Sequence, residues 1–263
     1  MSNEDPTARL PFKGGRPPHL PCGPGDVAED VLIPGDPDRV ALLKPLLEDV
    51  QDFGRRREYA LITGTYQGHR LTICSGGIGG PSTEIALVEL SILGAKRVVR
   101  IGGMSALVPQ ITPGEYFVPD NAIGNNGAAA IYAAHGFSAK ADPALAEALR
   151  QAAQDLGHPV HQGTVASVDG YYLGQDRPLA LDGSGPVTDY LDQFLAQGAK
   201  GCEMEAQTIL TVGQALGLQA ACLIGTHGNR ATNAWLVDYE PTQINLLHIA
   251  GKALKTLSAN IEV

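Results

Sequence analysis

Short apolar runs alternate with stretches of helical periodicity along most of the chain. Runs of strand length lie at 71–75, 98–102, 115–123, 162–168, 201–204 and 220–226. Apolar residues at helical spacing occupy 38–49, 82–94, 143–157, 188–198, 205–217 and 241–258. Strands that alternate with helices predict an α/β fold in which helices flank a mixed, partly parallel central sheet.

The length of 263 residues suits a single large domain, and no linker-like composition divides it. Residues 1–18 are rich in proline, glycine and charge, so we expect a flexible N-terminal segment followed by one domain over 19–263. Asp36 and the following proline favour a helix start, and Pro45 is expected to kink that first helix.

The 32 glycines make up about an eighth of the chain, against a usual share of about 7%. They gather near the ends of the expected strands. Glycine allows the backbone to approach a ligand closely, and ligands of open α/β folds bind at the carboxyl ends of strands. The pattern therefore predicts a small-molecule site at these ends.

Charge and cysteine usage exclude several classes of protein. Nineteen Lys and Arg against 28 Asp and Glu give a net charge of −9, which disfavours a nucleic-acid partner but leaves small anions possible. No apolar run reaches the roughly 20 residues of a membrane helix, and the N-terminus lacks the apolar core of a signal peptide. The four cysteines, Cys22, Cys74, Cys202 and Cys222, form no CxxC pair. All but Cys22 lie in apolar runs, which disfavours a zinc or disulfide framework. We expect a cytoplasmic enzyme.

Three arginine-bearing segments could each bind an anion or be structural. Arg39 lies one turn into the helix that Asp36 would cap, where free N–H groups favour an anion, although a capped helix with a solvated arginine is equally ordinary. Arg100 lies near the end of an apolar strand, where its charge needs an anion or a carboxylate. The charged run 55–58 is typical of a solvated face.

Three motifs in this order carry a more specific signal: PGDPDRV at 34–40, GGIGGPST at 76–83 and EME at 203–205. The chain resembles the nucleoside phosphorylase-I family (purine and uridine phosphorylases), and within it the branch that cleaves uridine. The likeness runs from His19 to the C-terminal helix. It implies a nucleoside phosphorylase/hydrolase-like α/β fold.

The resemblance implies a phosphate site. The family holds phosphate with residues that match Gly35, Arg39 and Arg100. A further arginine, matching Arg57, is lent by the neighbouring subunit. After the strand-end arginine the family usually has Gly followed by Ser or Thr, but this chain has Gly103 there. Its N–H remains, and Ser105 is a possible substitute for the lost hydroxyl.

The resemblance also places the ribose and the base. Glu203, Met204 and Glu205 match the ribose site, with the last glutamate bonding the sugar hydroxyls, and His19 matches a residue that reaches the ribose of the partner's site.

Tyr171, Gln175 and Arg177 match an aromatic residue and a Gln-x-Arg pair that read uracil. A glutamine offers both a donor and an acceptor, and an arginine can meet charge on a departing base. Arg230 resembles a further arginine near the pyrimidine. The segment 226–228 lacks the proton-donating Asp of purine-specific members.

The implied reaction is reversible phosphorolysis of uridine to uracil and ribose 1-phosphate in nucleoside salvage, with inorganic phosphate as co-substrate and no required cofactor. Its expected catalytic residues are Glu205, Arg100, Gln175 and Arg177. The family also implies a dimer that shares active sites, a hexamer built as a trimer of dimers, and a K⁺ ion held at the dimer interface by residues matching Glu58 and Ser75. A nucleoside hydrolase of the same fold, a purine nucleoside phosphorylase and a non-catalytic nucleoside-binding protein remain alternatives.

Several residues near these motifs favour structural interpretations. Glu203 and Glu205 straddle a strand end and are expected to point to opposite faces, which argues against a glycosidase pair. Met104 and Trp235 are expected to pack rather than contact a ligand. Among the remaining histidines, His227 alone falls near the expected base pocket, and none has metal-ligand spacing.

Overall fold

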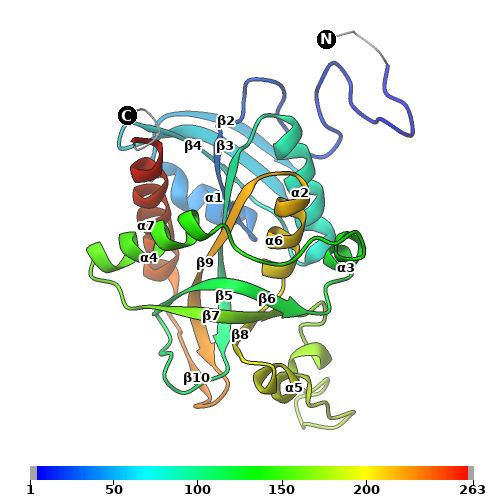
Figure 1. The fold of residues 1–263 in the computed structure, drawn as a ribbon, viewed down its shortest axis with the longest axis vertical. Coiled ribbons are helices and arrows are strands. Elements are labelled where there is room, and N and C mark those ends of the chain that lie inside the picture. The colour runs from blue at the N-terminus through cyan, green and yellow to red at the C-terminus, as the bar shows by residue number, and fades with distance from the viewer. Residues whose placement is uncertain (1–4, 260–263) are drawn as a thin grey trace.

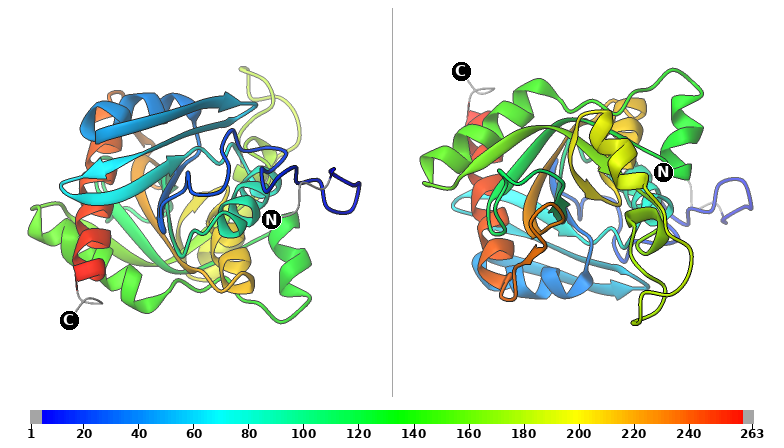
Figure 2. Two further views of the ribbon diagram at one scale, coloured as in Figure 1. Left: turned by 90° about the horizontal axis from the view of Figure 1, so that it is seen from above. Right: turned by 90° about the horizontal axis from the view of Figure 1, so that it is seen from below.

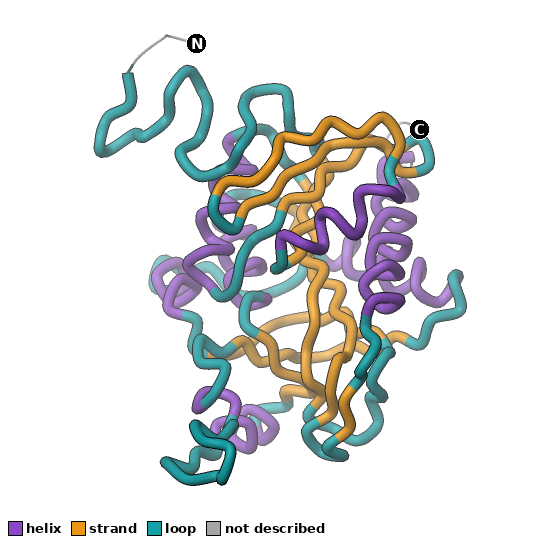
Figure 3. Tube along the Cα trace, turned by 180° about the vertical axis from the view of Figure 1, so that it is seen from behind, coloured by secondary structure: helices purple, strands orange, loops and turns teal. Residues whose placement is uncertain are grey.

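The apolar runs of the sequence build one mixed sheet, seen from the front in Figure 1 and from behind in Figure 3. The computed structural model describes residues 5–259, and in that range the sheet has ten strands. They are β1 (Asp30–Pro34), β2 (Glu48–Arg56), β3 (Tyr59–Tyr66), β4 (His69–Cys74), β5 (Arg97–Ala106), β6 (Tyr116–Gly124), β7 (Val160–Ser167), β8 (Ala199–Glu203), β9 (Gln219–Asn229) and β10 (Ala234–Trp235).

The strand order is β10-β9-β6-β7-β8-β5-β1-β4-β3-β2, with a further pairing between β9 and β5. Five strands therefore close a circuit, because β5 pairs with both β8 and β9 while β6 and β7 join those two on the other side. β1 lies parallel between β5 and β4. The carboxyl ends of β1, β5 and β9 consequently meet at one place.

Seven α-helices and two 3-10 turns accompany the sheet over residues 5–259. The helices are α1 (Pro37–Leu43), α2 (Gly80–Ile92), α3 (Gly127–Ala133), α4 (Pro143–Asp155), α5 (Tyr190–Ala196), α6 (Ala206–Ala215) and α7 (Glu240–Ala259), and the turns are η1 (Lys44–Leu46) and η2 (Leu173–Gln175). α1, α4 and α7 lie on one side of the sheet and α2, α3 and α6 on the other, as Figures 1 and 2 show. α5 packs against β8, and the loop between η2 and α5 extends from the body at the end opposite the N-terminal segment (Figures 1 and 3).

The α/β class and the flanked mixed sheet are confirmed, but the first expected helix is wrong in its second half. The helix stops at Leu43, and Pro45 lies in the short η1 turn instead of producing a kink. β2 follows from Glu48 at the edge of the sheet, with most of its side chains exposed. A strand exposed on both faces has no apolar alternation to reveal it.

One hydrophobic core fills the space between the sheet and the helices. Leu20 is fully buried, so the chain joins the core soon after the expected flexible segment 1–18. That segment falls partly outside the described residues, and its flexibility stays a prediction. All four cysteines are free and buried, and burial raises the pKa of the Cys202 thiol to about 11, so they act as small hydrophobes. Between residues 5 and 259, no helix has both the length and the apolar character needed to cross a membrane.

Candidate active site

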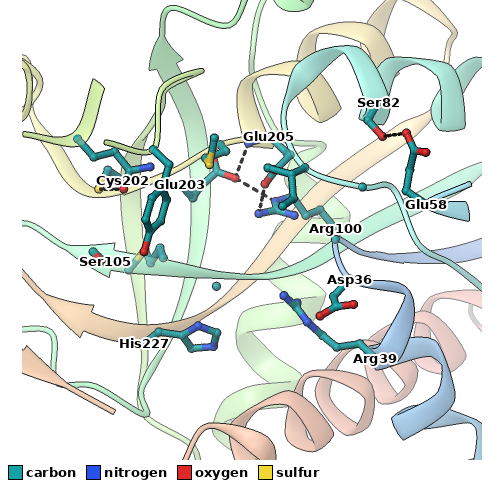
Figure 4. A pocket seen from close by; sticks show the side chains of 18 of the residues that line it. Asp36, Arg39, Glu58, Ser82, Arg100, Ser105, Cys202, Glu203, Glu205 and His227 are labelled. Atoms are coloured by element: carbon teal, nitrogen blue, oxygen red, sulfur yellow. Dashed lines mark hydrogen bonds and ion pairs between the residues drawn. The ribbon is translucent and has the colours of Figure 1, made fainter. Parts of the chain in front are cut away.

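A cavity of about 700 Å³ opens where the strands converge (Figure 4). The turn after β1, the turn between β4 and α2, the ends of β5, β8 and β9, and the loop after β7 all contribute to its wall. The predicted site residues that line it are Gly35, Arg39, Glu58, Arg100, Gly103, Tyr171, Gln175, Arg177, Glu203, Met204 and Glu205. The structure thus brings most of the predicted residues to one cavity at the strand ends.

Two glycine turns form the part of the wall next to α1. The N–H of Gly77 donates to the carbonyl of Gly35 at 3.0 Å, which joins the turn after β1 to the turn after β4. Asp36 caps α1 through the N–H of Asp38 at 2.9 Å, with a proline in the first turn, as the sequence predicted. The capped helix presents Arg39 to the cavity.

Arg39 is half-buried and makes no ion pair within residues 5–259. Its guanidinium donates to the carbonyl of Ile101 at 3.4 Å. Burial lowers the pKa of Arg39, and the nearby positive charge of Arg100 lowers it further. A partly desolvated cation that faces an open cavity favours binding of an anion there.

Arg100, in contrast, is buried between two carboxylates. Its Nε lies 3.0 Å from Glu203 Oε2, and its Nη2 lies 2.5 Å from Glu205 Oε2. Burial alone would lower the pKa of Arg100, but the charges of Glu205 and Glu203 outweigh it and raise that pKa. The charge of Arg100 is therefore balanced within the chain by Glu203 and Glu205, and Arg100 also lines the cavity.

The expectation that Glu203 and Glu205 point to opposite faces is wrong. Residues two apart in a strand share a face, so alternation past the end of β8 at Glu203 would also put Glu205 on the same face, and both side chains turn to Arg100 (Figure 4). The Glu203 carboxylate also accepts the N–H groups of Glu205 and Ala206 at 2.8 and 2.9 Å and the hydroxyl of Ser167. It therefore caps α6 and holds Arg100 in place.

The Glu205 carboxylate has fewer hydrogen-bond partners within the chain than the Glu203 carboxylate, and it lines the cavity. Its Oε1 accepts the N–H of Gly79 at 2.6 Å, and Gly79 has a φ of 83°, a conformation in which glycine is favoured. Burial raises the pKa of Glu205, and the ion pair with Arg100 opposes that rise. The carboxylate is thus positioned by one backbone donor and one cation at the middle of the cavity.

The opposite end of the cavity is formed by the loop 171–177. The Arg177 guanidinium lies 4.0 Å from the centre of the Tyr171 ring and donates to the Tyr171 carbonyl at 2.9 Å. It also donates to the side-chain oxygen of Gln175, which is buried. Burial lowers the pKa of Arg177. Gln175 and Arg177 therefore act as one unit, with the Gln175 amide nitrogen left to bind a ligand.

Residues 29–254 match the family described as the phosphorylase superfamily. The chain belongs to this family. A uridine phosphorylase from Thermococcus kodakarensis is 39% identical over 217 residues, which are 82% of this chain and 78% of that protein. A uridine phosphorylase from Salmonella typhimurium is 35% identical over 205 residues, 77% of this chain and 81% of that protein. A guanosine phosphorylase from Halorubrum lacusprofundi is 33% identical over 212 residues, 81% of this chain and 83% of that protein.

Four predicted residues lie outside the cavity of their own chain: His19, Arg57, Ser75 and Arg230. Arg57 is exposed at the tip of the β2–β3 hairpin, and His19 is held by Glu89, whose Oε1 lies 2.6 Å from its Nδ1. The resemblance assigned both to a neighbouring subunit's site, so their roles stay predictions. Arg230 is exposed and donates to the carbonyl of Asp176 at 3.1 Å, which supports the 171–177 loop from behind.

The predicted cation pair does not converge within the chain. The Ser75 hydroxyl is buried, donates to the carbonyl of Glu58 at 2.6 Å and accepts the N–H of Ala60 at 2.7 Å. The Glu58 carboxylate instead accepts from the Ser82 hydroxyl at 2.9 Å. Within one chain these two side chains face different partners, and the cation expected at the dimer interface stays a prediction. Within 5–259, no three His, Cys, Asp or Glu side chains gather as metal ligands.

The cavity also contains residues that the sequence did not assign to it. Arg55, Met104 and Trp235 line its wall beside Ser105 and His227. Met104 is also buried in the hydrophobic core, as expected, and the absence of a ligand contact for Met104 and Trp235 stays a prediction. A charged run such as 55–58 gives no signal for which arginine turns inward. His227 was the one histidine placed near the base pocket by its position in the chain, without a role.

Proposed function

We propose that this member of the phosphorylase superfamily is a uridine phosphorylase. The observation that carries the proposal is that the two ends of one cavity are lined by different functional groups. Arg39 and Arg100 stand at one end, Gln175 and Arg177 at the other, and Glu205 lies between them. Two relatives of similar length bear that name.

The arrangement supports a direct displacement at the sugar. A phosphate oxygen bonds to the anomeric carbon while the carbon–nitrogen bond breaks, and the electron pair leaves with uracil, which then takes a proton. Arg39 and the partner's equivalent of Arg57 would hold the phosphate, and Glu205 would bind the ribose hydroxyls while its charge favours the cationic sugar. Gln175 and Arg177 would stabilise the departing base as an anion, so a strong acid is unnecessary.

The experiment that tests this function measures uracil release from uridine with and without inorganic phosphate. We expect release to depend on phosphate and to yield ribose 1-phosphate in equal amount. Arg39→Gln is the informative variant, because it removes the cation that has no carboxylate partner and should raise the KM for phosphate. Equal rates without phosphate, with free ribose as the sugar product, would make the protein a hydrolase. Binding of uridine without turnover would make it a nucleoside-binding protein.

Purine phosphorolysis is the second candidate, because the guanosine phosphorylase relative is nearly as similar to this chain. The Gln175–Arg177 unit favours a pyrimidine, since its amide can pair with the edge of uracil. Uridine, thymidine, inosine and guanosine should be compared by kcat/KM under saturating phosphate. Cleavage of inosine or guanosine as efficient as that of uridine would contradict the pyrimidine assignment.

We also propose that two chains share each active site, within a dimer and a hexamer built from dimers. Arg57 at a hairpin tip and His19 beside Glu89 both lie outside the cavity of their own chain. Both positions are compatible with a contribution to the active site of a neighbouring subunit. A cytoplasmic location fits the same function.

Mixed assemblies should reveal the sharing. Arg57→Ala and Arg39→Ala chains, each inactive alone, should regain part of the parent's activity when unfolded, mixed and refolded together. The gain arises because one site in a mixed dimer receives both intact arginines. Two Arg39→Ala preparations mixed in the same way serve as the control. Mixed dimers with no more activity than either parent variant would show that each chain completes its own site.

A further inference from the structure

Gly103 and His227 occupy one place in the cavity wall. A Cβ atom added at Gly103 would lie 2.5 Å from both Cε1 and Nδ1 of His227. Such a separation is far inside van der Waals contact. The imidazole therefore fills the space where the usual Ser or Thr of the family would begin its side chain. A Ser or Thr at position 103 and the imidazole of His227 therefore cannot occupy these positions together.

A β-bulge turns His227 into this position. β5 and β9 pair in parallel register, with Met104 opposite Thr226, but the next pair joins Ser105 to Gly228. His227 is consequently the extra residue of β9, without a partner in the ladder. Bulges re-aim side chains and are common beside active sites. The ring lines the cavity and faces Arg39 across it (Figure 4).

The ring is held from α7 and from the segment before it. The Gln243 amide nitrogen lies 2.6 Å from His227 Nε2, and Gln243 is buried. The Tyr239 ring packs on the imidazole with centroids 5.0 Å apart. We assign the amide nitrogen as the donor to Nε2, which places the ring proton on Nδ1, one of the two ring atoms nearest Gly103.

Electrostatics keeps this imidazole neutral. Burial lowers the pKa of His227 to about 4, and the positive charge of Arg39 contributes to the decrease. At neutral pH the ring is therefore a donor of one hydrogen bond at Nδ1, as a hydroxyl would be. Ser105, the other possible substitute, pairs with Cys202 farther along β5 and lies well away from Arg39 in Figure 4.

We propose that His227 binds the phosphate co-substrate through its Nδ1–H, in place of the hydroxyl that Gly103 lacks. The proposal rests on the proposed function, because it assigns a residue to the phosphate end of that site. It gives His227 a specificity-determining role that does not require proton transfer. Gly103 is then needed to make room for the donor.

The first test compares two replacements of His227. Leucine fills much of the space without a donor, whereas asparagine places an N–H near the position of Nδ1. We expect His227→Leu to raise the KM for phosphate about 10- to 100-fold, the range of one hydrogen bond to a charged group. The KM for uridine should change by less than about threefold, and His227→Asn should recover much of the loss. An unchanged KM for phosphate, or an equal rise in both KM values, would overturn the proposal.

The second test exchanges the two positions. Gly103→Thr alone should impair phosphate use, since its Cβ meets the ring, and His227→Ala alone removes the donor. The double variant Gly103→Thr/His227→Ala has both the room and a hydroxyl, so its KM for phosphate should be lower than that of either single variant. Losses that simply add would show that the two residues do not substitute for each other.

Phosphate binding without nucleoside separates this inference from the proposed function. Inorganic phosphate should raise the melting temperature of the parent more than that of His227→Leu. If that difference appears but the parent releases no uracil with phosphate, the proposed function fails and the inference stands. If uracil release needs phosphate but phosphate stabilises both proteins equally, the inference fails alone. Nitrogen NMR of His227 should show the proton on Nδ1, and a proton on Nε2 would overturn the assigned donor.

Discussion

Replacing Arg100 with methionine should lower the free energy of unfolding by about 3–5 kcal/mol and abolish uracil release. The loss is large because the guanidinium neutralises two buried carboxylates, Glu203 and Glu205. Methionine fills much of the same volume, so packing is little disturbed and the unpaired charges dominate the result. Urea denaturation near pH 7 measures the change in stability.

The matched control is Arg39→Met, which removes the other arginine of the same cavity. Arg39 bonds only a carbonyl and is repelled by Arg100, so its loss should leave the free energy of unfolding within about 1 kcal/mol of the parent. Activity should still fall. A stability loss as large for Arg39→Met as for Arg100→Met would contradict the distinction between a paired and an unpaired arginine.

The stability of Arg100→Met should also depend on pH in a defined direction. Burial raises the folded-state pKa of Glu205, and without Arg100 only the Gly79 N–H and the charge of Arg39 oppose that rise. A folded-state pKa above the unfolded one adds stability at low pH that is lost as pH increases. The deficit relative to the parent should therefore shrink as pH falls toward about 5. A deficit independent of pH would mean that lost packing, not unpaired charge, causes it.

Arg177→Ala should reduce kcat/KM for uridine by about 2–4 kcal/mol in transition-state stabilisation, the scale of a donor to a developing anion. Gln175→Ala should do the same. Because the two side chains bond each other, the double variant should lose less than the sum of the single losses. Steady-state kinetics under saturating phosphate supplies all three values.

Two neighbouring replacements act as controls for this loss. Arg177→Lys keeps the charge but not the planar group that lies on Tyr171 and reaches its carbonyl, so it should recover only part of the activity. Arg230→Ala removes a bond to the same loop from outside the cavity and should cost about 1 kcal/mol or less. Equal losses for Arg230→Ala and Arg177→Ala would mean that the loop's position, not a donor to the base, is what matters.

The sequence was sufficient for features that depend on local pattern. Buried strands such as β5 and β9 have continuous apolar runs, and α1 begins where Asp36 can cap it. The edge strand β2 was missed because its side chains are exposed, and α3 because seven small or apolar residues show no helical periodicity. The largely buried β3 was also missed, because Thr63, Gly64 and Thr65 interrupt its apolar run. Burial alone therefore did not decide which elements the sequence revealed.

For the site, motifs predicted membership in one cavity but not the contacts inside it. The convergence of Glu203 and Glu205 on Arg100 depends on how β8 and β5 are placed relative to each other, which a single sequence does not reveal. The contact between Gly103 and His227 depends on a bulge that only the pairing of β5 with β9 defines. Both are tertiary relations between residues far apart in the chain.

The closed circuit of five strands ties the appearance of the cavity to the completion of the chain. β9 closes the circuit by pairing with β5 and β6, and it is the last of the five strands in chain order. During synthesis, a chain that ends before Gln219 can form β1 and β5 but has no wall at His227 and an open barrel edge. Long-range pairing of this kind is slow to form and leaves edges exposed meanwhile. The nascent protein would thus depend on protection of the open edges of β5 and β6 until about the last sixth of the chain emerges, and a fragment that ends before β9 would lack a complete cavity.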